Sequence, residues 1–308
     1  MTSCQRGLQN LVIEKSAENP FHKALETIVG RSKPEGGFAQ KEGGVFRPDA
    51  TAWAAMAISK MKAYRQIVDS ACRRLALSQL PDGRVILMEG MDTAWWPTPL
   101  ALLAWMKAGG FEKEAAAAEN FLLATSGRHY PKEKDTLAGH DTLIRGWSWI
   151  ENTHSWIEPT AMSTLALKAS GNRQHERLKE GMKMILDRQL STGGWNYGNT
   201  SVFDQELLPM PEHTGQALCA LSGNAKASEI QKSIDYLKDQ LPVLSTPLSL
   251  CWCLFGLKAW SVEVPDLRSF VLKAFSLQSR FGVYDTTLLA QLAIAYFSDG
   301  DLLGFLTG

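Results

Sequence analysis

The sequence lacks three features that each define a large class of proteins. There is no charge imbalance, because 32 Lys and Arg offset 32 Asp and Glu, and the basic residues are not clustered. Proteins that bind nucleic acid or an anionic membrane surface carry a basic patch, so neither partner is expected. No run of about 18 uncharged apolar residues occurs either, and we therefore expect no transmembrane segment.

The N-terminus and the cysteines lack further signals. Residues 1–16 have neither the basic start nor the apolar core of a secretory signal, which predicts a cytoplasmic protein. The five cysteines form no CxxC pair, so we expect reduced thiols and neither a metal ion nor another cofactor. With 45% hydrophobic residues, the chain is too apolar to be disordered.

A short phrase repeats along the chain: an acidic residue, any residue, a threonine and then an apolar stretch rich in alanine and leucine. Four copies keep the acid, and they begin at Asp49, Glu158, Glu212 and Asp285. Two further apolar stretches, after Thr98 and Pro247, lack the acid. The sequence therefore contains six related segments, with Thr51, Thr98, Thr160, Thr214, Pro247 and Thr287 as their anchors.

Two kinds of helix alternate in this pattern. The stretches after the anchors are apolar on nearly all sides, which is typical of a helix buried all round. The segments between them are amphipathic, with expected ranges 5–29, 63–79, 111–125, 172–189, 225–240 and 264–277. No segment has a strand pattern. We predict an all-α fold, an α6/α6 toroid with six inner and six outer helices in one domain over residues 1–308; an open solenoid is the alternative.

The segments before the inner helices carry a family resemblance. QLSTGGW at 189–195, and weaker copies at 79–85, 34–38 and 146–149, resemble the Gln/Gly/Trp repeats of squalene–hopene cyclases and related class II terpenoid cyclases. The inner helices also resemble those of protein prenyltransferase β subunits, members of the same superfamily. The resemblance covers residues 30–300, and it implies the toroid fold and a hydrophobic isoprenoid-type substrate.

The catalytic motifs of this superfamily are only partly present. Class II cyclases resemble one another in an Asp-x-Asp-Asp-Thr-Ala stretch whose central acid protonates the substrate. The matching stretch around Asp49 has no acidic neighbours, and the one around Asp92 has a methionine in the donor position. His213 resembles the histidine of the prenyltransferase zinc site, but the chain has no Asp-x-Cys pair to complete that site.

The candidate catalytic residues are Asp49, Glu158, Asp92, Glu212, His213 and Asp285. An acid at a helix start also caps free N–H groups and interacts favourably with the positive end of the helix dipole. A purely structural role is therefore the main alternative for the four acids that begin the repeated phrase, Asp49, Glu158, Glu212 and Asp285. A toroid would gather them around one mouth, where carboxylates can share a proton. His213 is interpreted as a rim residue, with a general base or metal ligand as the minority role.

Aromatic residues are the candidate substrate-binding groups. All ten tryptophans lie in the expected inner helices or in the segments that lead into them. Aromatic faces stabilise carbocations and pack against isoprenoid chains. The candidates are Trp53, Trp95, Trp96, Trp149, Trp156, Trp252 and Tyr284.

Two functions follow from these patterns. The first is an enzyme that binds a hydrophobic isoprenoid-type ligand in a central aromatic cavity and cyclises or isomerises it by protonation, with Asp49 or Glu158 as the acid. The second is a toroid without catalytic activity that binds a peptide, a lipid or a protein. The loss of both family motifs favours the second function, and the acids beside tryptophans favour the first.

Overall fold

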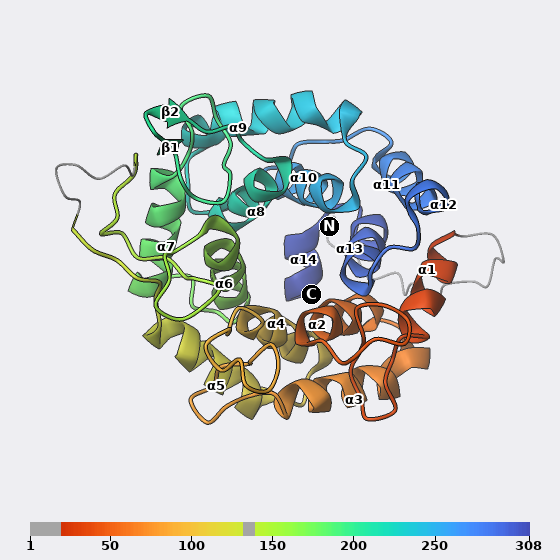
Figure 1. Cartoon of the computed structure of the whole chain (residues 1–308). Helices are drawn as coiled ribbons and strands as arrows, with labels where there is room; N and C mark the ends of the chain where they lie inside the picture. The colour runs from red at the N-terminus through yellow and green to blue at the C-terminus, as the bar shows by residue number, and fades with distance from the viewer. Residues whose placement is uncertain (1–19, 132–138) are drawn as a thin grey trace, which may run out of the picture.

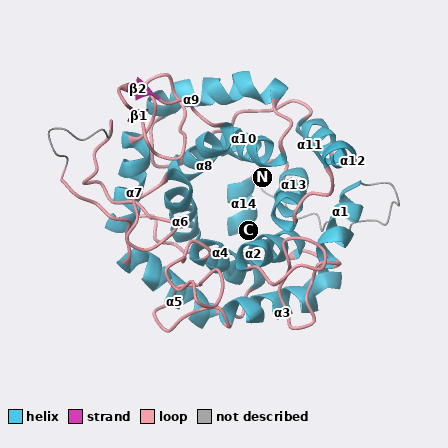
Figure 2. Ribbon diagram, viewed as in Figure 1, coloured by secondary structure: helices cyan, strands magenta, loops and turns pink. Residues whose placement is uncertain are grey.

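A computed structural model describes residues 20–131 and 139–308. Within them, two concentric layers of helices form a ring, which confirms the predicted all-α toroid (Figures 1 and 2). The inner layer consists of α2 (Pro48–Ile58), α4 (Thr98–Ala108), α6 (Ile157–Ala169), α8 (Pro211–Leu221), α10 (Pro247–Ala259) and α13 (Thr286–Phe297). The outer layer consists of α1 (Pro20–Val29), α3 (Arg65–Ala76), α5 (Glu112–Ala124), α7 (Glu176–Asp187), α9 (Ala227–Gln240) and α11 (Leu267–Ser276).

The ring is closed by contacts between its first and last inner helices. Helix α13 packs beside α2, and the chain that leads into α2 bonds directly to the start of α13. The buried Arg31 guanidinium donates hydrogen bonds to the Thr286 hydroxyl (3.1 Å) and to the Tyr284 carbonyl (2.8 Å). The Thr286 hydroxyl donates in turn to the Ala39 carbonyl (2.6 Å). A closed ring, and not an open solenoid, is therefore the observed architecture.

The two layers differ in burial as their sequences predict. In α6 eleven residues are buried, on all sides of the helix. In the outer helix α7 the buried apolar residues Leu178, Met182 and Ile185 lie on one face, while charged side chains occupy the other. An inner helix is covered by its two ring neighbours and one outer helix, so its sequence has no polar face.

A threonine anchors each of four inner helices to the preceding loop in the same way. The Thr160 hydroxyl accepts a hydrogen bond from the Trp147 N–H (2.9 Å) and donates one to the Trp147 carbonyl (3.3 Å). The same pair of bonds joins Thr51 to Phe38, Thr98 to Val85 and Thr214 to Trp195. The recurring threonine is thus explained by a bidentate bond that fixes where each inner helix begins.

The tryptophans of the repeat bond to neighbouring helices. The Trp147 indole N–H donates to the Leu122 carbonyl of α5 (2.9 Å), and the Trp195 indole N–H donates to the Ile185 carbonyl of α7 (2.7 Å). The Gln189 amide reaches the Ser233 hydroxyl of α9 (2.7 Å). The segments that carry Trp147 and Trp195 therefore each link an outer helix to the inner helix that follows it.

Several local features differ from the sequence-based expectation. The structure has a two-residue antiparallel pair, β1 (Ser201–Val202) with β2 (Gln205–Glu206), where no strand was expected. It also has 3₁₀ turns η1 (Lys62–Tyr64) and η2 (Leu241–Val243) and the short helices α12 (Gln278–Phe281) and α14 (Leu302–Thr307). The last anchor is Thr286 and not Thr287, because Thr286 makes the bonds to the loop. The expected helical range 5–19 and Cys4 lie outside the described residues.

Helix α14 closes one end of the ring. It lies at the centre of the ring in Figure 1, and Phe305 contacts Lys60 and Lys107, which lie at the C-terminal ends of α2 and α4. The Lys107 ammonium group also donates to the Phe305 carbonyl. Among the described residues, no helix is long and apolar enough to cross a membrane.

Candidate functional site

The N-terminal ends of the inner helices meet at the other end of the ring. Every inner helix is followed by an outer helix that returns, so the six inner helices run in the same direction. Asp49, Glu158 and Glu212 lie in the first turns of α2, α6 and α8, and Asp285 immediately precedes α13. The toroid thus brings the four predicted acids to one mouth, called here the N-terminal mouth.

Glu158 differs from the other acids at this mouth. Burial and, to a smaller extent, the charge of Glu212 together raise the pKa of its carboxyl group to about 7, against the opposing effect of a hydrogen bond with the Trp149 side chain. The Trp149 and Trp156 rings stack with their centroids 5.5 Å apart. Near neutral pH this acid therefore keeps its proton in a large fraction of molecules, beside two indoles.

The partner acid Glu212 lies on the neighbouring helix α8. Its carboxylate accepts a hydrogen bond from the Ser249 hydroxyl of α10 (2.7 Å). His213 follows it and is buried, and burial lowers the pKa of this imidazole, so the ring is neutral near pH 7. His213 Nδ1 lies 3.0 Å from the Gln216 amide oxygen. Because that oxygen only accepts, Nδ1 carries the proton and Nε2 is free to act as a base.

A loop at 195–198 spans the gap between α6 and α8. Its carbonyls accept from the Ile157 N–H (2.9 Å) and from the Met210 N–H (2.8 Å), which lie at the starts of the two helices. The Tyr197 ring lies over His213, with centroids 4.6 Å apart, and about half of the side chain is exposed. Glu158, Glu212, His213 and Tyr197 therefore form one group, supported by a single loop.

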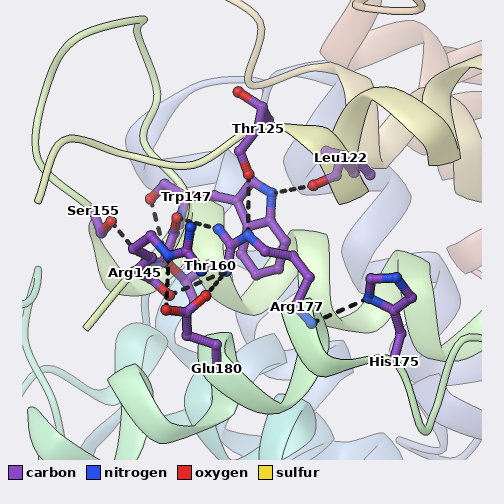
Figure 3. A network of polar contacts seen from close by, with 10 residues as sticks. Leu122, Thr125, Arg145, Trp147, Ser155, Thr160, His175, Arg177 and Glu180 are labelled. Carbon is purple, nitrogen blue, oxygen red and sulfur yellow. Dashed lines mark hydrogen bonds and ion pairs between the residues drawn. The ribbon is translucent and has the colours of Figure 1, made fainter. Parts of the chain in front are cut away.

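The segment that carries the stacked indoles is held from behind by Arg177 of α7 (Figure 3). The Arg177 side chain donates hydrogen bonds to the carbonyls of Thr125, Arg145 and Gly146. Its Cζ atom also lies 3.7 Å from the centroid of the Trp147 ring. The Trp147 carbonyl accepts from the Trp156 N–H (3.0 Å). Arg177 thus fixes the loop before α6, which carries Trp149 and Trp156 and leads to Glu158.

The remaining predicted acids have structural partners. Arg47 forms a bidentate ion pair with Asp49, with N–O distances of 2.9 and 3.0 Å. Asp285 caps α13, since its carboxylate accepts from the Leu288 N–H (2.8 Å). Asp92 lies in an exposed loop outside the inner helices. Asp49 and Asp285 are therefore engaged by groups close to them in the chain.

The predicted aromatic residues fall into three groups. Trp53 on α2 and Trp252 on α10 meet edge to face at 6.2 Å, although α13 separates these helices in the ring, so the two indoles meet inside it. Trp95 packs against Phe121 of the outer helix α5, and the Tyr284 hydroxyl donates to the Ala274 carbonyl of α11. Trp149, Trp156 and the half-buried Trp96 lie at the helix starts.

Sequence reasoning missed the partners that set the properties of these acids. Arg47, Ser249 and Tyr197 were not singled out. Arg47 lies two residues before Asp49, so its role was visible as an adjacent opposite charge. Ser249 on α10 and Tyr197 in the loop before α8 reach Glu212 and His213 through packing between consecutive repeats, and no local pattern indicated them.

Three surface pockets lie away from this mouth, and none is lined by a predicted site residue. The first, of about 580 Å³, lies between α5 and α7 around Arg145 and Lys183. The second, of about 380 Å³, follows α10, and the third, of about 220 Å³, lies beside α14. Within residues 20–131 and 139–308, no three His, Cys, Asp or Glu side chains are grouped so that they could hold a metal ion.

Comparisons with known proteins show the fold but no family. No protein-family model matches the chain, and no curated protein matches it in sequence. An α-1,6-mannanase of glycoside hydrolase family 76 from Salegentibacter sp. HEL1_6 superposes with a TM-score of 0.60 and 12% identity, covering 92% of this chain and 98% of the other. The type II terpene cyclase MstE from Scytonema gives 0.59 and 13%, covering 90% and 98%. A variant of that cyclase in complex with its product merosterolic acid A gives 0.57 and 15%, covering 92% and 97%. The chain thus shares the α/α toroid fold of two different classes of enzyme.

Proposed function

We propose that this protein is an enzyme of acid-initiated chemistry, in which Glu158 protonates a hydrophobic isoprenoid-type substrate at the N-terminal mouth. The observation that carries the proposal is the group formed there by Glu158, Glu212, His213 and the stacked Trp149 and Trp156. A proton donor, a base and aromatic faces are the groups that cyclisation or isomerisation of an alkene requires.

Residues of this chain can supply and accept every proton that the proposed reaction needs. Glu158 transfers its proton to one carbon of an alkene, which leaves a carboxylate and a carbocation. The faces of Trp149 and Trp156 stabilise the cation. In a cyclisation, an internal double bond of the substrate then attacks the cation; in an isomerisation, this step is absent. In both cases the carbon next to the cation loses a proton to His213 Nε2, which restores an alkene. Transfer of this proton to Glu158 through solvent completes the cycle, so the product is an isomer of the substrate.

The test uses purified protein with polyprenyl alcohols, polyprenyl diphosphates and squalene, followed by gas chromatography and mass spectrometry of the extract. Product of unchanged mass is expected from the wild type, and Glu158→Gln should lower the rate at least ~100-fold, in the range of a lost general acid. Asp49→Asn should retain the chemistry. Glu35→Gln, which changes an exposed loop acid, is the control. Equal rates for wild type and Glu158→Gln would refute the role of Glu158.

A second candidate, glycoside hydrolysis, is favoured by one specific observation. Two carboxylates on neighbouring helices, one with a raised pKa, resemble the acid and base pair of glycosidases, and exposed aromatic rings stack on sugars. The family 76 mannanase has the same fold. Incubation with α-1,6-linked mannooligosaccharides tests this directly, and release of mannose that requires both Glu158 and Glu212 would replace the isoprenoid proposal. Binding of lipid without turnover would instead support the non-catalytic alternative.

A further inference from the structure

Below the N-terminal mouth, the inner helices present a belt of residues at matching positions. The belt consists of the sixth residue of α2, α6, α8, α10 and α13 together with the third residue of α4. In chain order these residues, called here the inner belt, are Trp53, Leu100, Met162, Gln216, Trp252 and Gln291. Trp53, Met162 and Gln216 each lie four residues, about one helical turn, after the acid of their own helix.

Two observations place belt residues inside the ring. Trp53 and Trp252 contact each other across it, as described above. On α13, Tyr296 stacks on Phe21 of the outer helix α1, which marks the outward face of α13. Gln291 lies five residues earlier, about 140° around the helix axis, and therefore faces inward.

The belt also borders on space that a water molecule can reach. Trp53, Leu100, Met162, Gln216 and Gln291 keep 4, 5, 6, 3 and 3% of their surface exposed. Their neighbours Ala52, Ala101, Ala161, Ala217 and Leu292 are 0% exposed. Five of the six belt side chains therefore touch space that a water molecule can reach.

Two polar atoms of the belt have no partner among the described residues. They are the indole N–H of Trp252, whose side chain is 1% exposed, and the amide oxygen of Gln291. An unpaired buried polar group costs about 1–3 kcal/mol, so such a group in a folded protein requires an explanation. One atom is a donor and the other an acceptor, and they lie at the same level of the neighbouring helices α10 and α13.

The charges around the mouth restrict what these atoms bind. Asp49, Glu158, Glu212 and Asp285 lie above the belt. The nearby arginines are engaged with groups of the protein itself: Arg47 with Asp49, Arg31 with Thr286 and Tyr284, and Arg188 with the carbonyls of Ser155 and Gly198. A phosphate or carboxylate would meet these acids, and none of these three arginines is free to compensate its desolvation.

We propose that Trp252 and Gln291 form a binding site for a neutral hydroxyl group inside the ring, which selects an alcohol over the matching hydrocarbon or diphosphate. A hydroxyl accepts from the indole N–H and donates to the amide oxygen, so one group satisfies both atoms. The apolar remainder of the belt contacts the hydrocarbon part. This inference rests on the proposed function for the isoprenoid character of the ligand, but its two polar contacts are separate from Glu158.

The experiment measures equilibrium dissociation constants by calorimetry for geraniol, farnesol and geranylgeraniol, each beside its hydrocarbon and its diphosphate. The wild type should bind at least one alcohol about tenfold more tightly than its hydrocarbon, the value of one net hydrogen bond, and more tightly than its diphosphate. Trp252→Phe and Gln291→Leu should each reduce the preference to about threefold or less while leaving hydrocarbon affinity unchanged. Two variants are used so that misfolding of one does not decide the result.

Trp105→Phe is the matched control. Trp105 is equally buried on the inner helix α4, but its indole N–H already donates to the Cys72 carbonyl (3.1 Å), so its removal should not alter the preference. Equal binding of alcohol and hydrocarbon, tighter binding of the diphosphate, a preference that survives in both belt variants, or no binding of any of these ligands would overturn the inference. Glu158→Gln protein separates the two proposals: if it turns over substrate like wild type but keeps the alcohol preference, the catalytic proposal fails alone.

Discussion

The two ends of the ring carry opposite charge, and helix dipoles explain most of the difference. Acids occupy the starts of the inner helices, whereas Lys107, Lys168 and Lys258 lie in the last turns of α4, α6 and α10. Each sign is the one that the local dipole favours. Charge alone therefore does not identify a functional site.

The two ends differ in how their buried charges are used. Lys168 donates to the carbonyls of Ala220 and Ser222, and Lys107 donates to the last helix, so the C-terminal end is sealed by structural bonds. At the N-terminal end Glu158 has a pKa raised to about 7, although a helix start favours the ionised form. Burial and Glu212 together outweigh the dipole, which leaves a proton donor beside aromatic rings.

The largest expected effect concerns the sealed end. Phe305→Ala removes the ring that contacts Lys60 and Lys107 and leaves a cavity beside α14, and it should lower the free energy of unfolding by about 3–4 kcal/mol in urea titrations. Phe281→Ala, at a site where the ring is 65% exposed, is the control and should change it little. Equal effects of the two substitutions would show that α14 does not contribute to closing the ring.

A somewhat smaller effect is expected behind the N-terminal mouth. Arg177→Met leaves the carbonyls of Thr125, Arg145 and Gly146 without their donor and should cost about 2–4 kcal/mol of unfolding free energy. Arg280→Met changes an exposed arginine and serves as the control. If both variants unfold at the wild-type urea concentration, the network of Figure 3 does not hold this segment.

Glu158, at the N-terminal mouth, should make the stability of the protein depend on pH. Its pKa is raised on folding from 4.5 to about 7, so the folded state binds more protons, and stability falls as pH rises between these values. Glu158→Gln removes this penalty and should be about 1–2 kcal/mol more stable than wild type at pH 8, after allowance for solvent screening. Thermal melts from pH 4 to 8 measure the difference. A variant that is less stable than wild type at pH 8 would contradict the burial of this acid.

The sealed end should respond in the opposite direction and by less. Burial lowers the pKa of Lys168 from 10.5 to about 8, so the unfolded state binds more protons, and stability rises with pH between these values. In Lys168→Met this rise should be smaller by about 1 kcal/mol. Lys41→Met, in an exposed turn, should keep the wild-type slope. If the unfolding free energy of Lys168→Met rises with pH as steeply as that of the wild type, Lys168 is not the group with the lowered pKa.

The fold was predictable because its signal is repeated. The apolar inner helices, the amphipathic outer helices and the recurring threonine are each local patterns, and their combination favours a closed ring over an open solenoid. The departures occur where one copy differs: at α13 the anchor moved to Thr286, since that hydroxyl bonds to the chain entering α2. The extent of the domain over residues 1–308 stays a prediction, because residues 1–19 and 132–138 are outside the described part.

The candidate site was predictable only in outline. The sequence placed the acids at helix starts but ranked Asp49 above Glu158, because register with the cyclase motif carries no information about ion pairs or burial. Asp49 is paired with Arg47, whereas burial and then the charge of Glu212 raise the pKa of Glu158. Glu212 lies 54 residues after Glu158, and only the closure of α8 against α6 brings its charge close. The role of these residues in catalysis remains a prediction.

The titration of Glu158 tests the central claim most directly, and it needs no substrate. Carboxyl carbons of glutamate, labelled with ¹³C, are followed by NMR across the pH range, and the Glu158 signal is assigned as the one absent from Glu158→Gln. The account predicts a midpoint near 7 that shifts downward in Glu212→Gln. A midpoint near the ordinary glutamate value, or one insensitive to Glu212, would contradict it.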